Sequence, residues 1–515
     1  MCMCQLKKMY QRMIFVSSSS IHLKTNMMSL NSSVNRLYLS LGSVANYSSS
    51  KKYYDIVIAG GGMVGCAMAC KLSKEAALRG MSILLLEGGP NRKEYDLSLK
   101  KNTLDKNYSN RVSAVSKSSV QLLQSIGAWQ IIEDLGRNNA VKEMRIWNSG
   151  AGRSGGINNV LTFDNDNDLA YIVENDTILG ALYNQINEDQ NITVNYNSRV
   201  NQCNLSDSHR DLAIVKVANG DISFETSLLI GSDGYGSKVR SAISGQQYIS
   251  WEYGQRAVVA TLHIQSDEDD TYKGHVAWQK FAQLGPMALL PLDDKTCSLV
   301  WTTSYEEANR LAELSDNEFI DALNDSLSEE KESNNSSLLL ADDAVHILSK
   351  VLNKYCQSNC DRQNKKIKSI PPIAVGLIKD SRASFPLGFG HACQYVGQRV
   401  ALIGDAAHRI HPLAGQGVNL GFSDVTELSY QLNQSVLTGS DIGDLNALLN
   451  YQTAAQRRNV PIMLGVDGIQ KIYGSKNNLV PPAIITLIRN VGLTFCQSVS
   501  IVKKLLSDKA SGLPI

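Results

Sequence analysis

Residues 399–425 read RVALIGDAAHRIHPLAGQGVNLGFSDV and combine a strand, a glycine-rich turn and the start of a helix. The apolar run 400–403 predicts a buried strand, which Gly404 and Asp405 end. Apolar residues recur at helical spacing after the loop. The loop and the beginning of the helix contribute Pro412, Gly415, Gly417 and Asn419.

A strand, a glycine turn and a helix in this order can bind a ligand that carries negative charge. Backbone N–H groups and the positive end of the helix dipole point at such a ligand, and glycine allows a close approach because it has no Cβ. Asp405, at the carboxyl end of the strand, is placed to accept hydrogen bonds from ligand hydroxyls. The alternative is a tight turn capped by an aspartate.

A similar unit begins at residue 54. The apolar strand YDIVIA runs into GGGMVG at 60–65, a G-x-G-x-x-G pattern made by Gly60, Gly62 and Gly65. The first two glycines permit the turn and the approach to a pyrophosphate, and Gly65 allows close packing of helix on strand. Glu87 ends the next strand, where a carboxylate can accept from both hydroxyls of a ribose. The pattern predicts dinucleotide binding and does not distinguish NAD from FAD.

A third apolar strand, 227–230, stops at GSDGYGS. Its Asp233 can act as an acceptor or as a helix cap, and Arg240 as the partner of Asp233 or as a phosphate ligand. Arg111, in the segment NRVSAVS, can pair with phosphate bidentately or lie solvated at the surface.

Composition excludes several classes of protein. The chain of 515 residues has a net charge of +1, so we expect no nucleic-acid partner. The ten cysteines form no C-x-x-C pair, and we expect no metal site. Residues 1–52 are basic, rich in serine and free of acidic residues, as in a mitochondrial or plastid transit peptide; a disordered tail is the alternative. No apolar run reaches 18 residues, so we expect any membrane contact to be peripheral.

Residues 248–305 alternate apolar and polar in four short segments, which predicts an antiparallel sheet. Its Trp278, Phe281, Met287 and Trp301 either wall a hydrophobic substrate cavity or belong to the core. EEANRLAELSDNEFIDALND then reads as helical, about 325–370 as a polar low-complexity insertion, and the last 75 residues as largely helical.

The three turns resemble the fingerprints of the single-component (class A) FAD-dependent aromatic hydroxylases. They are GGGMVG at 60–65, GSDGYGSKVR at 231–240 and GDAAHRIHPLAGQGVNLG at 404–421. The segments NRVSAVS, GPMALLPL and RNVGL narrow the resemblance to the ubiquinone-biosynthesis (UbiH) hydroxylases, in particular to the eukaryotic mitochondrial ring C5-hydroxylases. The resemblance covers essentially residues 53–515, and the leader agrees with it.

The resemblance implies an α/β fold with three parts. They are a discontinuous Rossmann-like FAD-binding domain, an antiparallel β-sheet substrate domain and a helical C-terminal region. We expect the FAD-binding domain in 53–140, 171–247 and 392–440, the substrate domain in 141–170 and 248–391, and the helical region in 441–515.

The resemblance also assigns roles to the motif residues. Gly60, Gly62 and Gly65 hold the ADP half of FAD, Glu87 its ribose, and Arg111 approaches the phosphates and ribityl chain. Asp233 belongs to a motif for FAD and NAD(P)H, and Asp405 contacts the ribityl and pyrophosphate region. Pro412, Gly415, Gly417 and Asn419 lie along the isoalloxazine. No catalytic side chain is assigned. His408 and His411 flank this loop as structural caps or as a proton relay.

The implied reaction is hydroxylation at ring position C5 of a polyprenylated phenol or benzoate in ubiquinone biosynthesis, with O₂ and a flavin C4a-hydroperoxide. Electrons are expected from ferredoxin and its reductase. The enzyme is expected to lie on the matrix face of the mitochondrial inner membrane, in a complex of quinone-biosynthesis enzymes. Two alternatives remain: a flavin hydroxylase of a soluble aromatic substrate, and a non-enzymatic relative that binds prenyl groups as an escort protein.

Overall fold

The computed structural model describes residues 52–91, 97, 108–148, 161–164, 168–205, 211–218, 222–265, 274–282, 284–328, 371–412 and 415–473. The predicted transit segment except its last residue, nearly all of the predicted insertion, and residues 474–515 lie outside this part of the chain.

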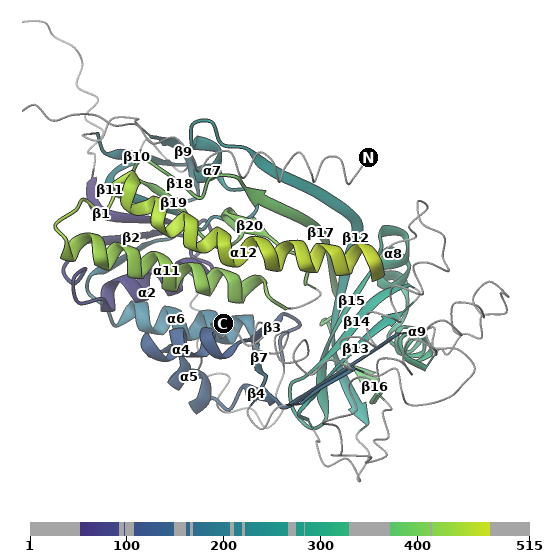
Figure 1. Cartoon of the computed structure of the whole chain (residues 1–515). Helices are drawn as coiled ribbons and strands as arrows, with labels where there is room; N and C mark the ends of the chain where they lie inside the picture. The colour runs from purple at the N-terminus through teal and green to yellow at the C-terminus, as the bar shows by residue number, and fades with distance from the viewer. Residues whose placement is uncertain are drawn as a thin grey trace, which may run out of the picture. The chain divides into compact units, whose positions relative to one another are not determined.

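A mainly parallel sheet carries the three predicted turns (Figure 1). Its strands run in the order β18-β19-β11-β1-β2-β8, and β10 and β9 extend it from β11. The pairs from β19 through to β8 are parallel, whereas β18 and β10 run antiparallel to their neighbours. The strands are β1 Lys52–Ala59, β2 Ile83–Leu86, β8 Ile192–Asn195, β9 Val200–Asn204, β10 Ala213–Val217, β11 Ser223–Gly231, β18 Val396–Gly397 and β19 Val400–Leu402.

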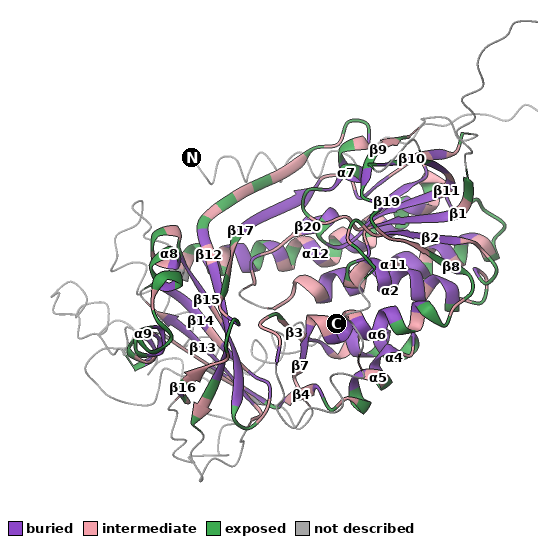
Figure 2. Cartoon of the chain, turned by 180° about the vertical axis from the view of Figure 1, so that it is seen from behind, coloured by how far each residue is buried: buried purple, intermediate pink, exposed green. Residues whose placement is uncertain are grey.

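The central strands of this sheet are apolar on both faces because both faces are covered, as is usual for parallel sheets. Val57, Leu229 and Ala401 are each fully buried. Figure 2 shows β11 and β19 buried along most of their length and β1 buried in its second half. The predicted strand at 400–403 is thus confirmed, one residue shorter.

A larger, mainly antiparallel sheet confirms the four strands expected in 248–305. Its order is β20-β17-β12-β15-β14-β13-β5-β6, with β16 on β12, and β13–β5 is its parallel pair within the described residues. The strands are β5 Glu143–Asn148, β6 Leu161–Asp164, β12 Tyr248–Gln265, β13 Val276–Ala282, β14 Gly285–Pro291, β15 Thr296–Ser304, β16 Ile373–Leu377, β17 Ala383–Ala392 and β20 His408–Arg409.

A small antiparallel sheet, ordered β3-β7-β4, was not predicted. Its strands are β3 Val112–Val115, β7 Ala170–Glu174 and β4 Asn138–Val141. Each has only four or five residues, which is too short for a clear alternation in the sequence.

The helices largely follow the predicted pattern, with one difference. The segment predicted as one helical stretch after β15 forms two helices, α8 and α9, because Ser315 and Glu318 form a capping box that starts the second. Helix α9 ends at Ser328, so residues 325–328 of the predicted insertion are helical. The helices are α2 Met63–Lys74, α4 Lys117–Ser125, α5 Ala128–Asp134, α6 Asn175–Asn187, α7 Lys238–Ala242, α8 Tyr305–Glu313, α9 Asp316–Ser328, α11 Gly417–Leu437, α12 Leu445–Tyr473 and the 3-10 turn η3 Gly404–Ala406.

Candidate functional site

The sheet register brings the three predicted turns to one edge. Ala59 at the end of β1 pairs with Gly231 of β11 and with Leu86 of β2, and Gly231 pairs with Leu402 of β19. The residues that follow these strand ends therefore lie side by side. Ligands of open α/β sheets bind at the carboxyl ends of the strands, so the three motifs form one candidate site.

The three glycines of G-x-G-x-x-G have different surroundings. Gly60 has φ of +107°, and a Cβ there would lie 2.4 Å from the Ser232 carbonyl oxygen, so the turn needs glycine. A Cβ on Gly65 would lie 2.0 Å from the Gly60 carbonyl oxygen, which shows the tight packing of α2 on the turn. A Cβ on Gly62 would meet no described protein atom within 4 Å. The open side of Gly62 is where a pyrophosphate can approach the backbone.

Glu87 is held against the first turn. Its Oε2 accepts a hydrogen bond from the Gly61 N–H at 2.8 Å, and its Oε1 accepts one from the Gly89 N–H at 2.6 Å. Each carboxylate oxygen can accept a further bond. The side chain is half-buried, which leaves a route to ribose hydroxyls.

Asp233 caps helix α7, one of its two expected roles. Its Oδ2 accepts hydrogen bonds from the Lys238 N–H at 2.7 Å and the Val239 N–H at 3.3 Å. Its Oδ1 is buried and has no hydrogen-bond partner among the described residues. A buried carboxylate oxygen is costly to leave unpaired, so Asp233 retains an acceptor for a ligand.

Arg240 does not form the expected ion pair with Asp233, because its guanidinium is engaged elsewhere. Its expected role as a phosphate ligand stays a prediction. Nη1 donates to the Ala406 carbonyl at 2.8 Å, and Nη2 donates to the Tyr235 carbonyl at 2.6 Å. The guanidinium carbon lies 3.8 Å from the centre of the Tyr248 ring. Arg240 thus joins the turn of Asp233 to the turn of Asp405.

Asp405 is a solvent-accessible carboxylate in the turn that follows β19. Solvent reaches its side chain, yet desolvation by the surrounding protein raises its pKa, against the opposing effects of His408 and Arg409. Both observations hold for a carboxylate with water on one side and protein on most others. The carboxylate accepts no hydrogen bond from the described residues, so it is available to ligand hydroxyls.

Asn419 holds the loop before α11 onto the small sheet. Its Oδ1 accepts from the Ser116 N–H and the Ser119 hydroxyl, and its Nδ2 donates to the Ala114 and Gly415 carbonyls. These four bonds use the capacity of the amide. Asn419 therefore shapes the loop through its backbone contacts.

The rest of that loop has the backbone features expected of a tight turn. Gly415 has φ of +58°, and a Cβ there would lie 3.3 Å from Cβ of Ala114 in β3. Its N–H donates to the Pro412 carbonyl at 2.9 Å. Gly417 is the first residue of α11. Pro412 is half-buried, and residues 413–414 lie outside the described part of the chain.

Arg111 is exposed. Its carbonyl accepts from the Asn175 N–H at 2.9 Å, and its guanidinium forms no ion pair with the described residues. It directly precedes β3, which contacts the loop through Ala114, so the guanidinium can turn toward the site or into solvent.

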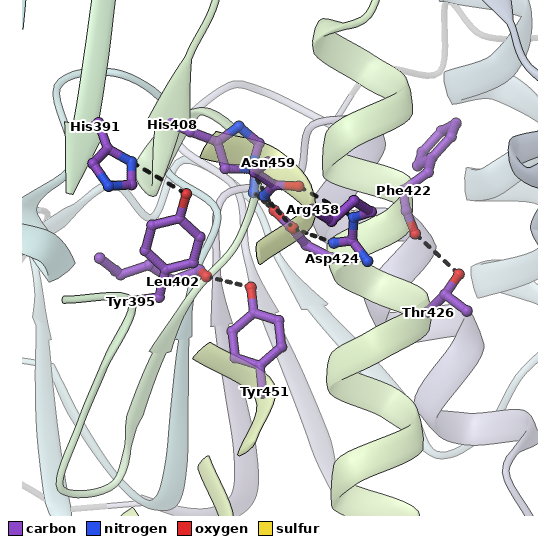
Figure 3. A network of polar contacts seen from close by, with 11 residues as sticks. His391, Tyr395, Leu402, His408, Phe422, Asp424, Thr426, Tyr451, Arg458 and Asn459 are labelled. Atoms are coloured by element: carbon purple, nitrogen blue, oxygen red, sulfur yellow. Dashed lines mark hydrogen bonds and ion pairs between the residues drawn. The ribbon is translucent and has the colours of Figure 1, made fainter. Parts of the chain in front are cut away.

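The two histidines of the motif are both buried. His408 Nε2 lies 2.5 Å from Oδ2 of Asp424 in α11, which favours the structural alternative (Figure 3). The His411 ring packs edge-on against Tyr253 with centroids 5.1 Å apart, and burial lowers its pKa to about 3. A histidine with this pKa stays neutral at physiological pH.

One face of the large sheet packs on helices α8 and α9, and helix α12 contacts the other face where the Gln470 amide donates to the Gln255 side chain. Trp278, Met287 and Trp301 pack with α8 and α9, so these three belong to the core. Phe281 lies on the opposite face because successive residues alternate. A cross-strand row on that opposite face contains Ile146, Gln279, Ala288, Val300 and Val259.

This row is apolar except for Gln279. Ile146, Ala288 and Val300 are half-buried and join none of the core clusters of the described residues. Farther along the same face, Met144 and Leu290 pack with Val112 and Ala114 of β3. This buried to half-buried row is therefore on the face that meets β3, the strand that contacts the loop before α11.

Sequence reasoning missed Asp424, which contacts His408, and Arg458 and Asn459, which contact Asp424. A signal was present for Asp424, since it falls on the same helical stripe as Leu420 and Leu428, four residues from each. A charged residue in an apolar stripe indicates a buried and paired carboxylate. No comparable signal connects it to Arg458 or Asn459 on another helix.

Comparison with known proteins identifies the family. A family described as "FAD binding domain" matches residues 53–338 and 372–461. The ubiquinone biosynthesis monooxygenase COQ6, mitochondrial, of Xenopus tropicalis is 40% identical over 472 residues, covering 90% of this chain and 94% of that protein. The human protein of the same name is 38% identical over 474 residues, with the same coverage.

The chain belongs to the family of mitochondrial ubiquinone biosynthesis monooxygenases. Solved structures agree on the fold. The p-nitrophenol 4-monooxygenase PnpA of Pseudomonas putida superposes with a TM-score of 0.60 at 14% identity, covering 90% of this chain and 100% of that chain. PqsL of Pseudomonas aeruginosa gives 0.58 at 16% identity, covering 86% and 100%.

The site residues fit the FAD that this family binds. The open side of Gly62, the unpaired Oδ1 of Asp233 and the unbonded carboxylate of Asp405 supply a close backbone approach and acceptors for hydroxyls. The predicted fold class and cofactor are thus confirmed. Within the described residues, no helix is long and apolar enough to cross a membrane.

Proposed function

We propose that this protein is the mitochondrial FAD-dependent monooxygenase that hydroxylates ring position C5 of a polyprenylated phenol or benzoate in ubiquinone biosynthesis. The observation that carries this proposal is the meeting of three nucleotide-type turns at one sheet edge in a chain of this family. The mainly apolar row of the large sheet, formed by Ile146, Gln279, Ala288, Val300 and Val259, supports the substrate class.

The chain's own residues would hold FAD along this edge. Gly60, Gly62 and Gly65 receive the ADP half, and Glu87 accepts from its ribose. Asp233 and Asp405 offer acceptors, and Arg111 can turn toward the phosphates. The loop of Pro412, Gly415, Gly417 and Asn419 runs beside the flavin ring. Bound reduced FAD supplies the activation of O₂.

The apolar row then orients the substrate and excludes water. Ile146, Ala288 and Val300 offer aliphatic surface to a prenylated ring, and the Gln279 amide offers a donor and an acceptor to ring oxygens. No charged side chain lies in this row, which fits an uncharged, lipid-like substrate better than a soluble aromatic acid. In the overall reaction, the ring C–H, O₂, two electrons and two protons give a ring C–OH and water.

A direct test combines the full-length purified protein with FAD, a prenylated phenol, a reductant and isotopically labelled O₂. We expect one labelled oxygen atom in the ring, detected by mass spectrometry. The variant Ala288→Trp should retain FAD but lose most product, because an indole would fill the space over the row. The matched variant Ala282→Trp, at the strand end of β13, should retain more activity.

Unlabelled product, or no product from a flavin-loaded protein with several prenylated phenols, would contradict the proposed reaction. Full activity of Ala288→Trp would contradict only the proposed placement of the substrate on this row, and the proposed reaction would stand.

The same assay tests the electron source, and fractionation of mitochondria tests the location. We propose that ferredoxin and its reductase deliver the electrons, and that the enzyme works at the matrix face of the inner membrane with other quinone-biosynthesis enzymes. Replacing the ferredoxin system by NADPH alone should then lower the rate strongly. Equal rates would contradict the electron source. Enzyme that stays in the soluble fraction of lysed mitochondria, without its pathway partners, would contradict the location.

A further inference from the structure

The turn that carries Asp405 is held at both ends by one buried carboxylate (Figure 3). Asp424 of α11 is fully buried. Its Oδ2 accepts from the Gly404 N–H at 3.0 Å and lies 2.5 Å from Nε2 of His408. Gly404 directly precedes Asp405, and His408 follows it by three residues.

Two residues of α12 complete the surroundings of this carboxylate. Oδ1 of Asp424 accepts from Nη2 of Arg458 at 3.0 Å and from Nδ2 of Asn459 at 3.0 Å. Burial by itself would raise the pKa of Asp424, but His408, Arg458 and Asn459 outweigh it and the pKa is lowered. The group is therefore an anion with four donors, which offsets the large cost of burying a charge.

Contacts from two helices support the backbone of this turn. Gly404 has φ of +58°, a conformation that favours glycine, and its carbonyl accepts from the Ala407 N–H at 2.8 Å. Helix α11 approaches so closely that a Cβ on Gly421 would lie 3.4 Å from Cα of Gly404. Tyr451 of α12 adds a hydrogen bond to the Leu402 carbonyl at 2.8 Å.

Asp405 itself lies between the two clamped residues and has no such support. Its carboxylate accepts no hydrogen bond from the described residues and is accessible to solvent. Its direction is therefore set by the backbone of residues 404–408, and that backbone is set by Asp424.

We propose that Asp424 is a positioning residue for the cofactor: by holding Gly404 and His408 it fixes the direction of the Asp405 carboxylate, and FAD affinity depends on it. This inference rests on the proposed role of Asp405 in FAD binding. Arg458 and Asn459 extend the same support to α12.

The test is a double-mutant cycle on FAD binding, measured by titrating full-length apoprotein and following flavin fluorescence. We expect Asp405→Asn to weaken binding and Asp424→Asn to weaken it about tenfold, as for one lost charge-assisted hydrogen bond. Because Asp424 acts through Asp405, the double variant should have the same FAD affinity as the single variant with the lower affinity.

Glu143→Gln is the matched control, because Glu143 and Arg145 form a comparably buried ion pair at 2.6 Å on the helix-covered side of the large sheet. It should lower stability without changing FAD affinity. If Asp424→Asn does not fold, Arg458→Met removes one donor from a side chain that is 31% exposed. It should weaken binding about threefold, again only when Asp405 is present.

The outcomes separate this inference from the proposed cofactor site. Wild-type affinity in Asp424→Asn, or additive losses in the double variant, would overturn the positioning role and leave the site intact. Wild-type affinity in Asp405→Asn would overturn the placement of Asp405 at the cofactor and the positioning role with it. An equal loss in Glu143→Gln would show a general stability effect and would also overturn the inference.

Discussion

Replacing Arg240 by lysine should weaken the connection between two of the three cofactor turns. Arg240 lies in α7 and is 7% exposed. Its guanidinium donates to the Ala406 carbonyl at 2.8 Å and to the Tyr235 carbonyl at 2.6 Å while it stacks on Tyr248. A lysine ammonium is a compact charge that cannot keep this fork and this stacking together.

The magnitude follows from the contacts that lysine loses. One hydrogen bond from a charged donor contributes about 1.5–3 kcal/mol, and a largely desolvated cation–π contact contributes about 0.5–2 kcal/mol. If lysine keeps one of the two hydrogen bonds, Arg240→Lys should reduce the free energy of unfolding by about 2–5 kcal/mol. FAD affinity should fall as well, because the turns of Asp233 and Asp405 lose their common anchor.

Urea unfolding of the apoprotein, together with FAD titration, measures both effects. Arg310→Lys is the control, because Arg310 is half-exposed and pairs with Glu307 on the surface of α8. It should change stability by less than about 0.5 kcal/mol. Equal stability and equal FAD affinity in Arg240→Lys and the wild type would refute the reasoning that Arg240 holds the turns together.

Two further predictions concern the first turn and the pH dependence of stability. Gly65→Ala should destabilise the fold by about 1–3 kcal/mol, because its Cβ would lie 2.0 Å from the Gly60 carbonyl oxygen. Gly62→Ala should leave urea unfolding unchanged and weaken FAD binding, and the reverse pattern would contradict these roles. Burial lowers the pKa of His391 to about 4 and that of His411 to about 3. The unfolded chain binds protons at these side chains below about pH 6.5, where the folded chain does not, so the free energy of unfolding should fall as pH falls from 6.5 to 4. His391→Gln should make the fall shallower by up to about 1.4 kcal/mol per pH unit.

The arrangement of the candidate site was predictable because its signals are local. A buried strand followed by glycines can be recognised within about ten residues, and parallel strands place such turns at the same edge. Gly60 and Gly65 also have the surroundings that the motif predicts. The sequence could not decide whether Trp278 and Trp301 line a cavity, because that depends on which face the helices α8 and α9 cover.

The contacts that support the turns were not predictable, because they join segments that are distant in sequence. Arg240 was expected to pair with a phosphate or with Asp233, which is close to it in sequence. Its partners instead include the carbonyl of Ala406, in the turn that follows another strand. Asp424 could be recognised as buried, yet Arg458 and Asn459 are supplied by a different helix. Contacts between distant segments depend on packing angles that the residue pattern does not encode.

The supporting residues nevertheless lie close in sequence to the turns that they hold. Arg240 is in the helix that Asp233 caps, and Asp424 and Asn419 are in the helix that follows the loop of Asp405. Each helix therefore carries side chains that bind turn backbone. Since these side chains contact carbonyl and N–H groups and leave the ligand side free, their loss should misplace the cofactor before it unfolds the sheet. FAD affinity is consequently a more sensitive measure of these contacts than global stability.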